Sequence, residues 1–177
     1  MTSKDPRIES LFETALELEK KGKLFYDQAA SRSDPELGGR IFKLLAEEEL
    51  THIERIKKIH EAIEAEGVFP ADWQGLTPKL GNLGKVFREL AIQHGRGINA
   101  QTSDLEALDT GIDLEARSIA FYQDLGQKAA SAPEKEFLDK MVDEERSHHT
   151  ALTDMKFYLS DPAGWFLENE KGGLDGA

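Results

Sequence analysis

The chain has 177 residues, the usual size of one domain, and is long enough to bury roughly two-thirds of its unfolded surface. Its net charge of −12 disfavours nucleic acid or an anionic membrane surface as a partner, because both would repel it. The absence of Cys excludes disulfides, thiolate metal sites and a Cys nucleophile, so any metal ligand must be Glu, Asp or His.

The N-terminal residues contain no apolar run of the length that a signal peptide or a membrane span needs. We therefore expect a cytoplasmic protein without a membrane segment. Gly and Pro are sparse in two long blocks, of which the first divides at Asp34-Pro35 and the second at a capping box of Ser131 and Glu134. The sequence thus predicts four helices, 6–30, 35–65, 104–130 and 133–159, with a further capping box of Ser103 and Glu106 before the third.

Apolar residues recur at steps of three, four and seven in the predicted helices. In helix 35–65 they include Phe42, Leu45, Ile53 and Ile56, which lie on one side of a helix with 3.6 residues per turn. Helices of this kind, each about 40 Å long, bury their apolar stripes against one another. The sequence therefore predicts an all-α fold, a four-helix bundle.

The second half of the chain repeats the first with an offset of 96 residues. Leu18-Glu19 reappears as Leu114-Glu115, and Glu48-Glu49 with His52 reappears as Glu144-Glu145 with His148. We interpret the two halves, 6–65 and 104–159, as copies of one helical hairpin, in which a short loop makes the two helices antiparallel neighbours.

The connection 66–103 is too long to be a plain loop in a compact domain. Helical spacing from Leu80 to Ala91 predicts a short crossover helix at about 82–94 that covers the bundle, and a flexible lid is the alternative. The surplus length leaves room for swapped pairing, and we expect a homodimer. The bundle would occupy residues 1–160, and the tail 161–177 would pack on the bundle or on a partner chain.

Four carboxylates are predicted to point into one core. Glu49 and Glu145 each lie within an apolar stripe and three residues before a His, while Glu115 and Glu19 are central on the other two helices. Carboxylates buried together without a partner would repel until several took up protons, whereas two divalent cations would neutralise them. We therefore predict a two-metal site with the ligands Glu19, Glu49, His52, Glu115, Glu145 and His148.

Tyr26 and Tyr122 each follow a predicted ligand by seven residues, so each lies on the same side of its helix two turns away. Their hydroxyls could bond ligand carboxylates, although plain core packing explains them equally well. Glu17, Glu47, Glu48, Asp143 and Glu144 fall off the stripes, and we expect solvated faces for them, although Glu48 and Glu144 do repeat.

These patterns resemble the ferritin-like superfamily and, within it, rubrerythrins that lack a rubredoxin domain. The resemblance rests on Glu17-Leu-Glu-Lys-Lys-Gly22 and Glu47-Glu-Glu-Leu-Thr-His52 in the first hairpin, and on Glu115 and Glu145-Arg-Ser-His148 in the second. The ending Asp161-Pro-Ala-Gly-Trp-Phe166 to Leu174-Asp-Gly176 is also similar to that of related ferritin-like proteins. What the resemblance implies is a ferritin-like bundle with two Fe ions, bridged by Glu49 and Glu145 or by Glu19 and Glu115.

The implied activity is an oxidoreductase that reduces hydrogen peroxide or dioxygen, with the four Glu as the catalytic metal-bridging and terminal carboxylates. Because the chain has no Cys for a rubredoxin iron site, the electron donor would be a separate protein. Rubrerythrins tend to carry an extra Glu one turn after the third-helix ligand, where this chain has Ser118, which puts fast peroxidase cycling in doubt.

Two other functions fit the same residues. One is a ferroxidase or iron-handling protein whose substrate is Fe²⁺, and the other is a metal-stabilised bundle without turnover. Mn or Zn could also occupy such ligands, because carboxylates and imidazoles accept several divalent ions.

Overall fold

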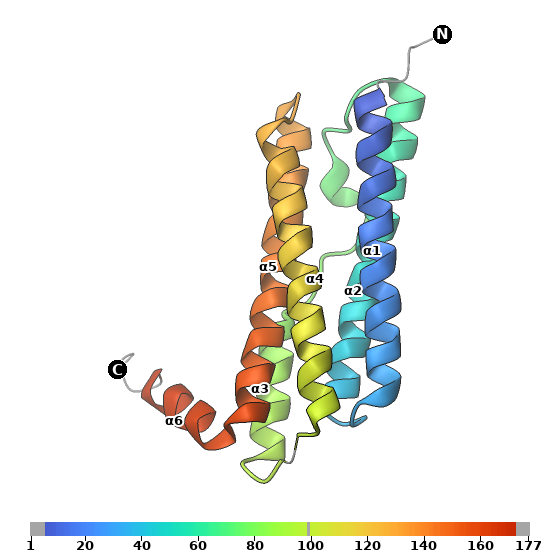
Figure 1. Ribbon diagram of the computed structural model, residues 1–177. Helices are drawn as coiled ribbons and strands as arrows, with labels where there is room; N and C mark the ends of the chain where they lie inside the picture. Colours follow the sequence, from blue (N-terminus) through green and yellow to red (C-terminus); the bar gives the residue numbers. More distant parts are fainter. Residues whose placement is uncertain (1–5, 99, 173–177) are drawn as a thin grey trace.

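The computed structural model describes residues 6–98 and 100–172, and every regular element within them is helical. In chain order these are α1 (Pro6–Arg32), α2 (Gly38–Glu66), the 3-10 helix η1 (Trp73–Gly75), α3 (Leu83–His94), α4 (Thr102–Gln127), α5 (Ala132–Ser160) and α6 (Pro162–Gly172). α1 pairs with α2 and α4 with α5, and the two hairpins lie side by side (Figure 1). The predicted all-α bundle is confirmed.

The turn between α1 and α2 is longer than the sequence pattern predicted. The Asp34 carboxylate accepts a hydrogen bond from the Leu37 N–H at 3.3 Å, and the Asp34 carbonyl accepts one from the Gly39 N–H at 2.7 Å. A Cβ atom at Gly39 would lie 3.0 Å from that carbonyl oxygen, so this close approach requires a glycine. Pro35 therefore belongs to the turn, and the predicted start of α2 there is wrong, since α2 begins at Gly38.

The start of α4 also differs from the prediction. Gln101 is the N-cap, and the Asp104 carboxylate accepts a hydrogen bond from the Gln101 N–H at 3.1 Å. This capping box replaces the one predicted for Ser103 and Glu106, both of which lie inside the helix. At its other end α4 stops at Gln127, three residues before the predicted end.

The start of α5 follows the sequence pattern in part. The Ser131 hydroxyl accepts a hydrogen bond from the Glu134 N–H at 3.3 Å, as an N-cap does. The Glu134 carboxylate accepts from the Ala130 N–H at 2.8 Å and from Arg7 at 3.1 Å instead of closing a box with Ser131. This ion pair joins the start of α5 to the start of α1.

The crossover between the hairpins is packed against the bundle. α3 begins at its N-cap Asn82, whose side chain accepts a hydrogen bond from the Lys85 N–H at 2.9 Å, and it lies along the lower part of α5 (Figure 1). Phe87 of α3 and Trp73 of η1 are buried. The predicted crossover helix is confirmed, and its buried side chains disfavour the alternative of a flexible lid.

The tail continues as a short helix, α6, that the sequence analysis did not predict. Its first turn follows Asp161, and Trp165 is buried with its ring 5.3 Å from that of Tyr158 and 6.0 Å from that of Phe87. The Trp165 indole N–H donates to Asp154 at 2.8 Å. These contacts seat α6 on α5 and the crossover, while residues 173–177 of the predicted tail lie outside the described residues.

The apolar core is divided into two clusters along the bundle. On α2, for example, Phe42 and Leu45 belong to one cluster and Ile56 and Ile59 to the other. The residues between them on each of the four long helices include a buried carboxylate. The fold therefore places a polar layer between two apolar ones.

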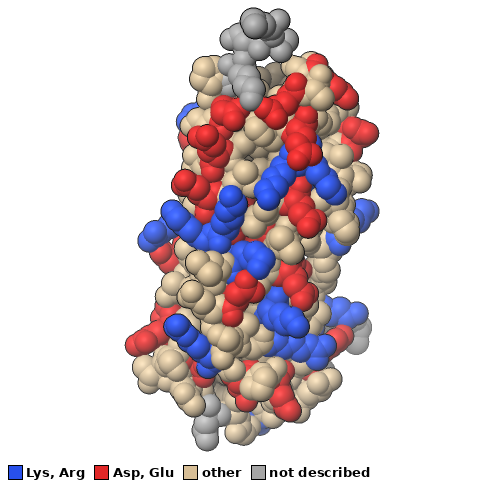
Figure 2. Space-filling model, turned by 90° about the vertical axis from the view of Figure 1, so that its right-hand side faces the viewer, with Lys and Arg blue, Asp and Glu red and all other residues tan. Residues whose placement is uncertain are grey.

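On the face formed by α1 and α2, acidic and basic side chains are interspersed and do not gather into a patch of one sign (Figure 2). Lys23 and Asp27, one turn apart on α1, form one such exposed pair at 2.6 Å. None of the described helices combines the length and the apolar composition that crossing a membrane requires.

Candidate metal centre

Six side chains of the polar layer converge between the two apolar clusters. They come from all four long helices, and the residues are between 0% and 3% exposed: Glu19 of α1, Glu49 and His52 of α2, Glu115 of α4, and Glu145 and His148 of α5. These are the six residues that the sequence analysis predicted as ligands, and the structure brings all of them together.

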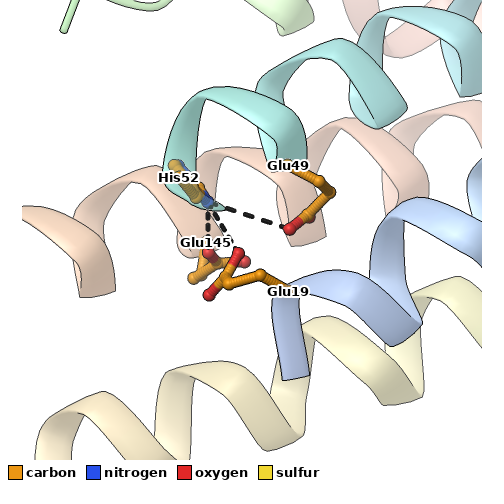
Figure 3. Close-up of side chains that lie close together, drawn as sticks. All are labelled: Glu19, Glu49, His52 and Glu145. Carbon is orange, nitrogen blue, oxygen red and sulfur yellow. Dashed lines mark hydrogen bonds and ion pairs between the residues drawn. The ribbon is translucent and has the colours of Figure 1, made fainter. Parts of the chain in front are cut away.

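The first group of possible ligand atoms surrounds the Nδ1 atom of His52. This atom lies 3.0 Å from Glu19 Oε2, 3.0 Å from Glu145 Oε1 and 3.8 Å from Glu49 Oε2 (Figure 3). The four residues point toward one common point from three helices (Figure 3), and their ligand atoms lie within 4.8 Å of one another.

The second group surrounds the Nδ1 atom of His148. This atom lies 3.6 Å from Glu49 Oε1, 3.6 Å from Glu145 Oε2 and 3.7 Å from Glu115 Oε2. Glu49 and Glu145 therefore belong to both groups, and each turns one oxygen toward each His. Of the two bridging pairs that the resemblance left open, the geometry favours Glu49 and Glu145.

Two polar atoms of this layer that make no hydrogen bond indicate that the residues could hold metal. Within this layer, His148 Nδ1 and Glu145 Oε1 are buried and make no hydrogen bond in the described part of the chain. A buried polar atom without a partner is costly, and both of these atoms face the centre of the cluster, where an ion would bind them. Carboxylate oxygens and imidazole nitrogens are ligands that Fe, Mn and Zn accept.

The pKa values of the clustered residues also favour bound metal. Burial raises the pKa of Glu115 to about 8, with Glu145 adding to the effect, and burial together with Glu19 and Glu145 raises the pKa of Glu49. Burial lowers the pKa of His52, but the charges of Glu19 and Glu145 outweigh it and raise that pKa above its usual value. Without a metal the cluster therefore holds protons at neutral pH, which bound cations would replace.

The hydroxyls of the two tyrosines bond carboxylates of the cluster, each on a helix of the other hairpin. The Tyr26 hydroxyl of α1 donates to Glu115 of α4, and the Tyr122 hydroxyl of α4 donates to Glu19 of α1. Burial and the nearby carboxylates raise the pKa of both phenols, so both stay protonated as donors. Of the two alternatives that the sequence left open, the structure favours a bond to a clustered carboxylate over plain core packing, with the partner on the opposite helix.

Glu48 and Glu144 correct the sequence analysis, which expected solvated faces for them. Glu144 Oε2 accepts from the Nε2 atom of His52 at 3.1 Å, and Glu48 Oε2 accepts from the Nε2 atom of His148 at 2.6 Å. An imidazole that donates Nε2–H to a carboxylate keeps Nδ1 free to bind a metal and becomes a stronger ligand. The repeat of both Glu at an offset of 96 was the signal that could have identified them.

We therefore predict that Glu144→Gln and Glu48→Gln each lower metal affinity by about 10- to 100-fold, the usual cost of losing a carboxylate behind a metal-binding His. Calorimetric titration of the metal-free variants with Co²⁺ measures the change. Glu47→Gln is the matched control, because Glu47 is exposed on the same helix. Equal affinities of all three variants and the wild-type chain would contradict the assigned roles.

Gly22 of α1 leaves the space that the Glu49 carboxylate occupies. A Cβ atom at this position would lie 3.3 Å from Glu49 Cδ and 3.5 Å from Glu49 Oε2. We expect Gly22→Ala to displace this carboxylate and weaken metal binding on the order of tenfold. The same change favours the helix by about 0.5–1 kcal/mol, so the metal-free variant should melt no lower than wild type. A calorimetric scan with and without metal separates the two effects, and unchanged metal affinity would contradict the prediction.

Comparison with known proteins adds one match. The family model described as rubrerythrin matches residues 10–156, a span that includes both hairpins and all six clustered residues. No curated protein matches the chain. No solved structure matches it either.

Proposed function

The chain belongs to the rubrerythrin family, and we propose that it is a di-iron oxidoreductase that reduces hydrogen peroxide or dioxygen. The observation that carries the proposal is the arrangement of Glu49 and Glu145, each with one oxygen toward His52 and the other toward His148. Such an arrangement suits two adjacent ions. A purely structural site needs only one closed set of ligands.

A bound pair of iron ions would supply two electrons and adjacent positions for the two oxygen atoms of the oxidant. The chain's own task is to hold that pair. Glu49 and Glu145 would span both ions, Glu19 and His52 would complete one side, and Glu115 and His148 would complete the other.

The surrounding side chains keep this arrangement rigid and dry. Tyr26 and Tyr122 fix the terminal carboxylates from the opposite hairpin, which makes the two hairpins one unit at the centre. The apolar clusters on both sides, which include Phe42 and Met141, exclude bulk water and strengthen the electrostatic interactions within the layer.

Reduction of one peroxide to two waters consumes two electrons and two protons, so the iron ions would have to be reduced again after each turnover. We propose that these electrons come from a donor outside these 177 residues. The chain contains no Cys that could form a rubredoxin iron site. The donor would therefore bind transiently and pass electrons to the buried layer.

The test compares peroxide consumption with reductant supply. Protein loaded with Fe²⁺ under anaerobic conditions is mixed with hydrogen peroxide and a soluble chemical reductant, and both are followed in time. Consumption of one peroxide for every two electrons over many cycles supports the proposal. Oxidation and retention of many Fe²⁺ ions per chain would favour a ferroxidase instead, and retention of two unreactive ions would indicate a metal-stabilised bundle.

A further inference from the structure

The two His residues of the cluster differ in the charged groups around the carboxylate that accepts their Nε2–H. Glu144, the partner of His52, also accepts a hydrogen bond from Arg55 at 2.6 Å and forms an ion pair with Lys140 at 3.3 Å. Arg55 is 4% exposed. Among the described residues no Lys or Arg pairs with Glu48, the partner of His148. The charge of Glu144, which accepts from His52, is therefore neutralised by the side chains of Arg55 and Lys140. The charge of Glu48, which accepts from His148, is not neutralised in this way.

This difference breaks the internal repeat of the chain. At the offset of 96 residues, Arg55 corresponds to Ala151 and Lys140 corresponds to Leu44. The predicted ligands repeat at this offset, and so do Glu48 and Glu144. The side chains of Arg55 and Lys140, which neutralise Glu144, do not repeat. The asymmetry is thus a property of the sequence as well as of the side-chain packing.

We infer that the two metal positions are unequal: the position of Glu115 and His148 fills first and binds more tightly, and Arg55 weakens the position of Glu19 and His52. The inference rests on the proposed two-metal centre and adds the order in which its positions fill. It makes Arg55 a positioning residue that acts through Glu144 and His52.

Two physical effects weaken the same position. A carboxylate that accepts Nε2–H from an imidazole makes its Nδ1 a stronger ligand, and Glu144 does this less because it shares its charge with Arg55 and Lys140. Arg55 and Lys140 also cancel the negative charge of Glu144, so a cation at the His52 position is attracted less than one at the His148 position, where the charge of Glu48 is not compensated.

An open cleft lies next to the pair of Arg55 and Glu144 on this side of the centre. Arg55 and Glu144 line an open cleft of about 660 Å³ between the crossover and α5, together with Trp73 and Thr77. Arg55 donates to the Thr77 hydroxyl at 3.0 Å, so the crossover itself holds the guanidinium in place. The weaker position is thus one hydrogen-bonded pair away from the cleft, which favours exchange of its ion.

The first experiment identifies which position is tighter. Metal-free His52→Gln and His148→Gln proteins, each with one intact His, are titrated with Co²⁺ by calorimetry. We expect His52→Gln to keep one tight ion and His148→Gln to bind its ion at least about tenfold more weakly. In a protein that binds two ions, repulsion between the ions weakens the second binding step whichever position fills first. The two His variants avoid this effect because each keeps only one intact His. Equal affinities, or tighter binding by His148→Gln, would overturn the inference.

The second experiment tests Arg55 directly. Added to His148→Gln, the change Arg55→Gln should raise Co²⁺ affinity about tenfold, whereas Arg55→Lys, which keeps the charge, should not. Lys57→Gln removes an equal charge from an exposed position two residues away and is the matched control. No gain with Arg55→Gln would overturn the role of Arg55. If that variant fails to fold, the comparison of the two His variants still decides the order of filling.

Failure of this inference differs from failure of the proposed function. Two ions bound with equal affinity to a protein that consumes peroxide would overturn only the inequality. Ordered filling of two positions in a protein that never reacts with peroxide or dioxygen would support the inequality and overturn the oxidoreductase.

Discussion

Glu145→Gln is expected to remove both metal ions, an effect we expect only at a carboxylate that belongs to both groups. Its two carboxylate oxygens face His52 at 3.0 Å and His148 at 3.6 Å, so one change withdraws a ligand from both positions. Gln has nearly the same shape but no charge, and packing should be little disturbed. Metal counted per chain after Fe²⁺ loading and desalting should fall from two to below about 0.2, if affinity falls by the several kcal/mol that a lost charged ligand costs.

Glu49→Gln should behave in the same way, since Glu49 also faces both His residues. Glu19→Gln and Glu115→Gln should each impair one position and leave about one ion per chain, since each carboxylate lies in one group only. The matched control is Glu47→Gln, because Glu47 is exposed and two residues from Glu49. Two ions retained by Glu145→Gln would contradict the bridging role.

Removal of the metal is expected to lower the melting temperature by roughly 15–30 °C. An ion at 1,000 times its Kd stabilises a fold by about 4 kcal/mol, so two ions supply about 8 kcal/mol. For a domain of this size, 1 kcal/mol corresponds to about 2–4 °C. Loss of the ions also leaves four carboxylates buried together, whose mutual repulsion opposes folding.

Differential scanning calorimetry of the metal-free and Mn²⁺-loaded protein measures this shift. Glu145→Gln serves as the control, because it should melt at the same temperature with and without metal. Equal melting temperatures for loaded and metal-free wild-type protein would show that the buried layer needs no ion, and would count against the whole metal assignment.

The six clustered residues could be predicted because two signals agreed. Glu49 and Glu145 lie within apolar stripes, where a carboxylate is out of place, and the offset of 96 residues repeats each Glu with its His. A helix fixes the direction of each Cβ atom, so periodicity predicts that each of these carboxylates faces the core of the bundle. The order of the helices and the crossover helix 82–94 follow from the same reasoning.

Glu48 and Glu144 were assigned wrongly because helical periodicity describes where a side chain starts and not how far it reaches. Each lies beside the stripe, and its long side chain extends to the His of the facing helix. The sequence analysis did not single out Arg55, because a buried guanidinium is stable only with partners such as Glu144 and Thr77 that no local pattern reveals.

The helix boundaries show a different limit. Asp34-Pro35 and Asp161-Pro162 are the same dipeptide, yet only the second begins a helix. After Pro35 the chain passes close to the end of α1, and Gly39 favours this because a Cβ atom there would lie only 3.0 Å from the Asp34 carbonyl oxygen and 3.1 Å from that of Ala30. Tertiary packing therefore overrides the local start signal there.

The most direct test of the two-metal centre is anaerobic Fe²⁺ loading of the metal-free wild-type protein, followed by one equivalent of hydrogen peroxide. Metal analysis gives the number of ions per chain, and Mössbauer spectroscopy gives the fraction that is oxidised. We predict two Fe²⁺ ions per chain, both converted to Fe³⁺ by a single peroxide. Fewer than one ion per chain would contradict the two-metal centre, and two ions that remain ferrous would contradict the proposed oxidoreductase.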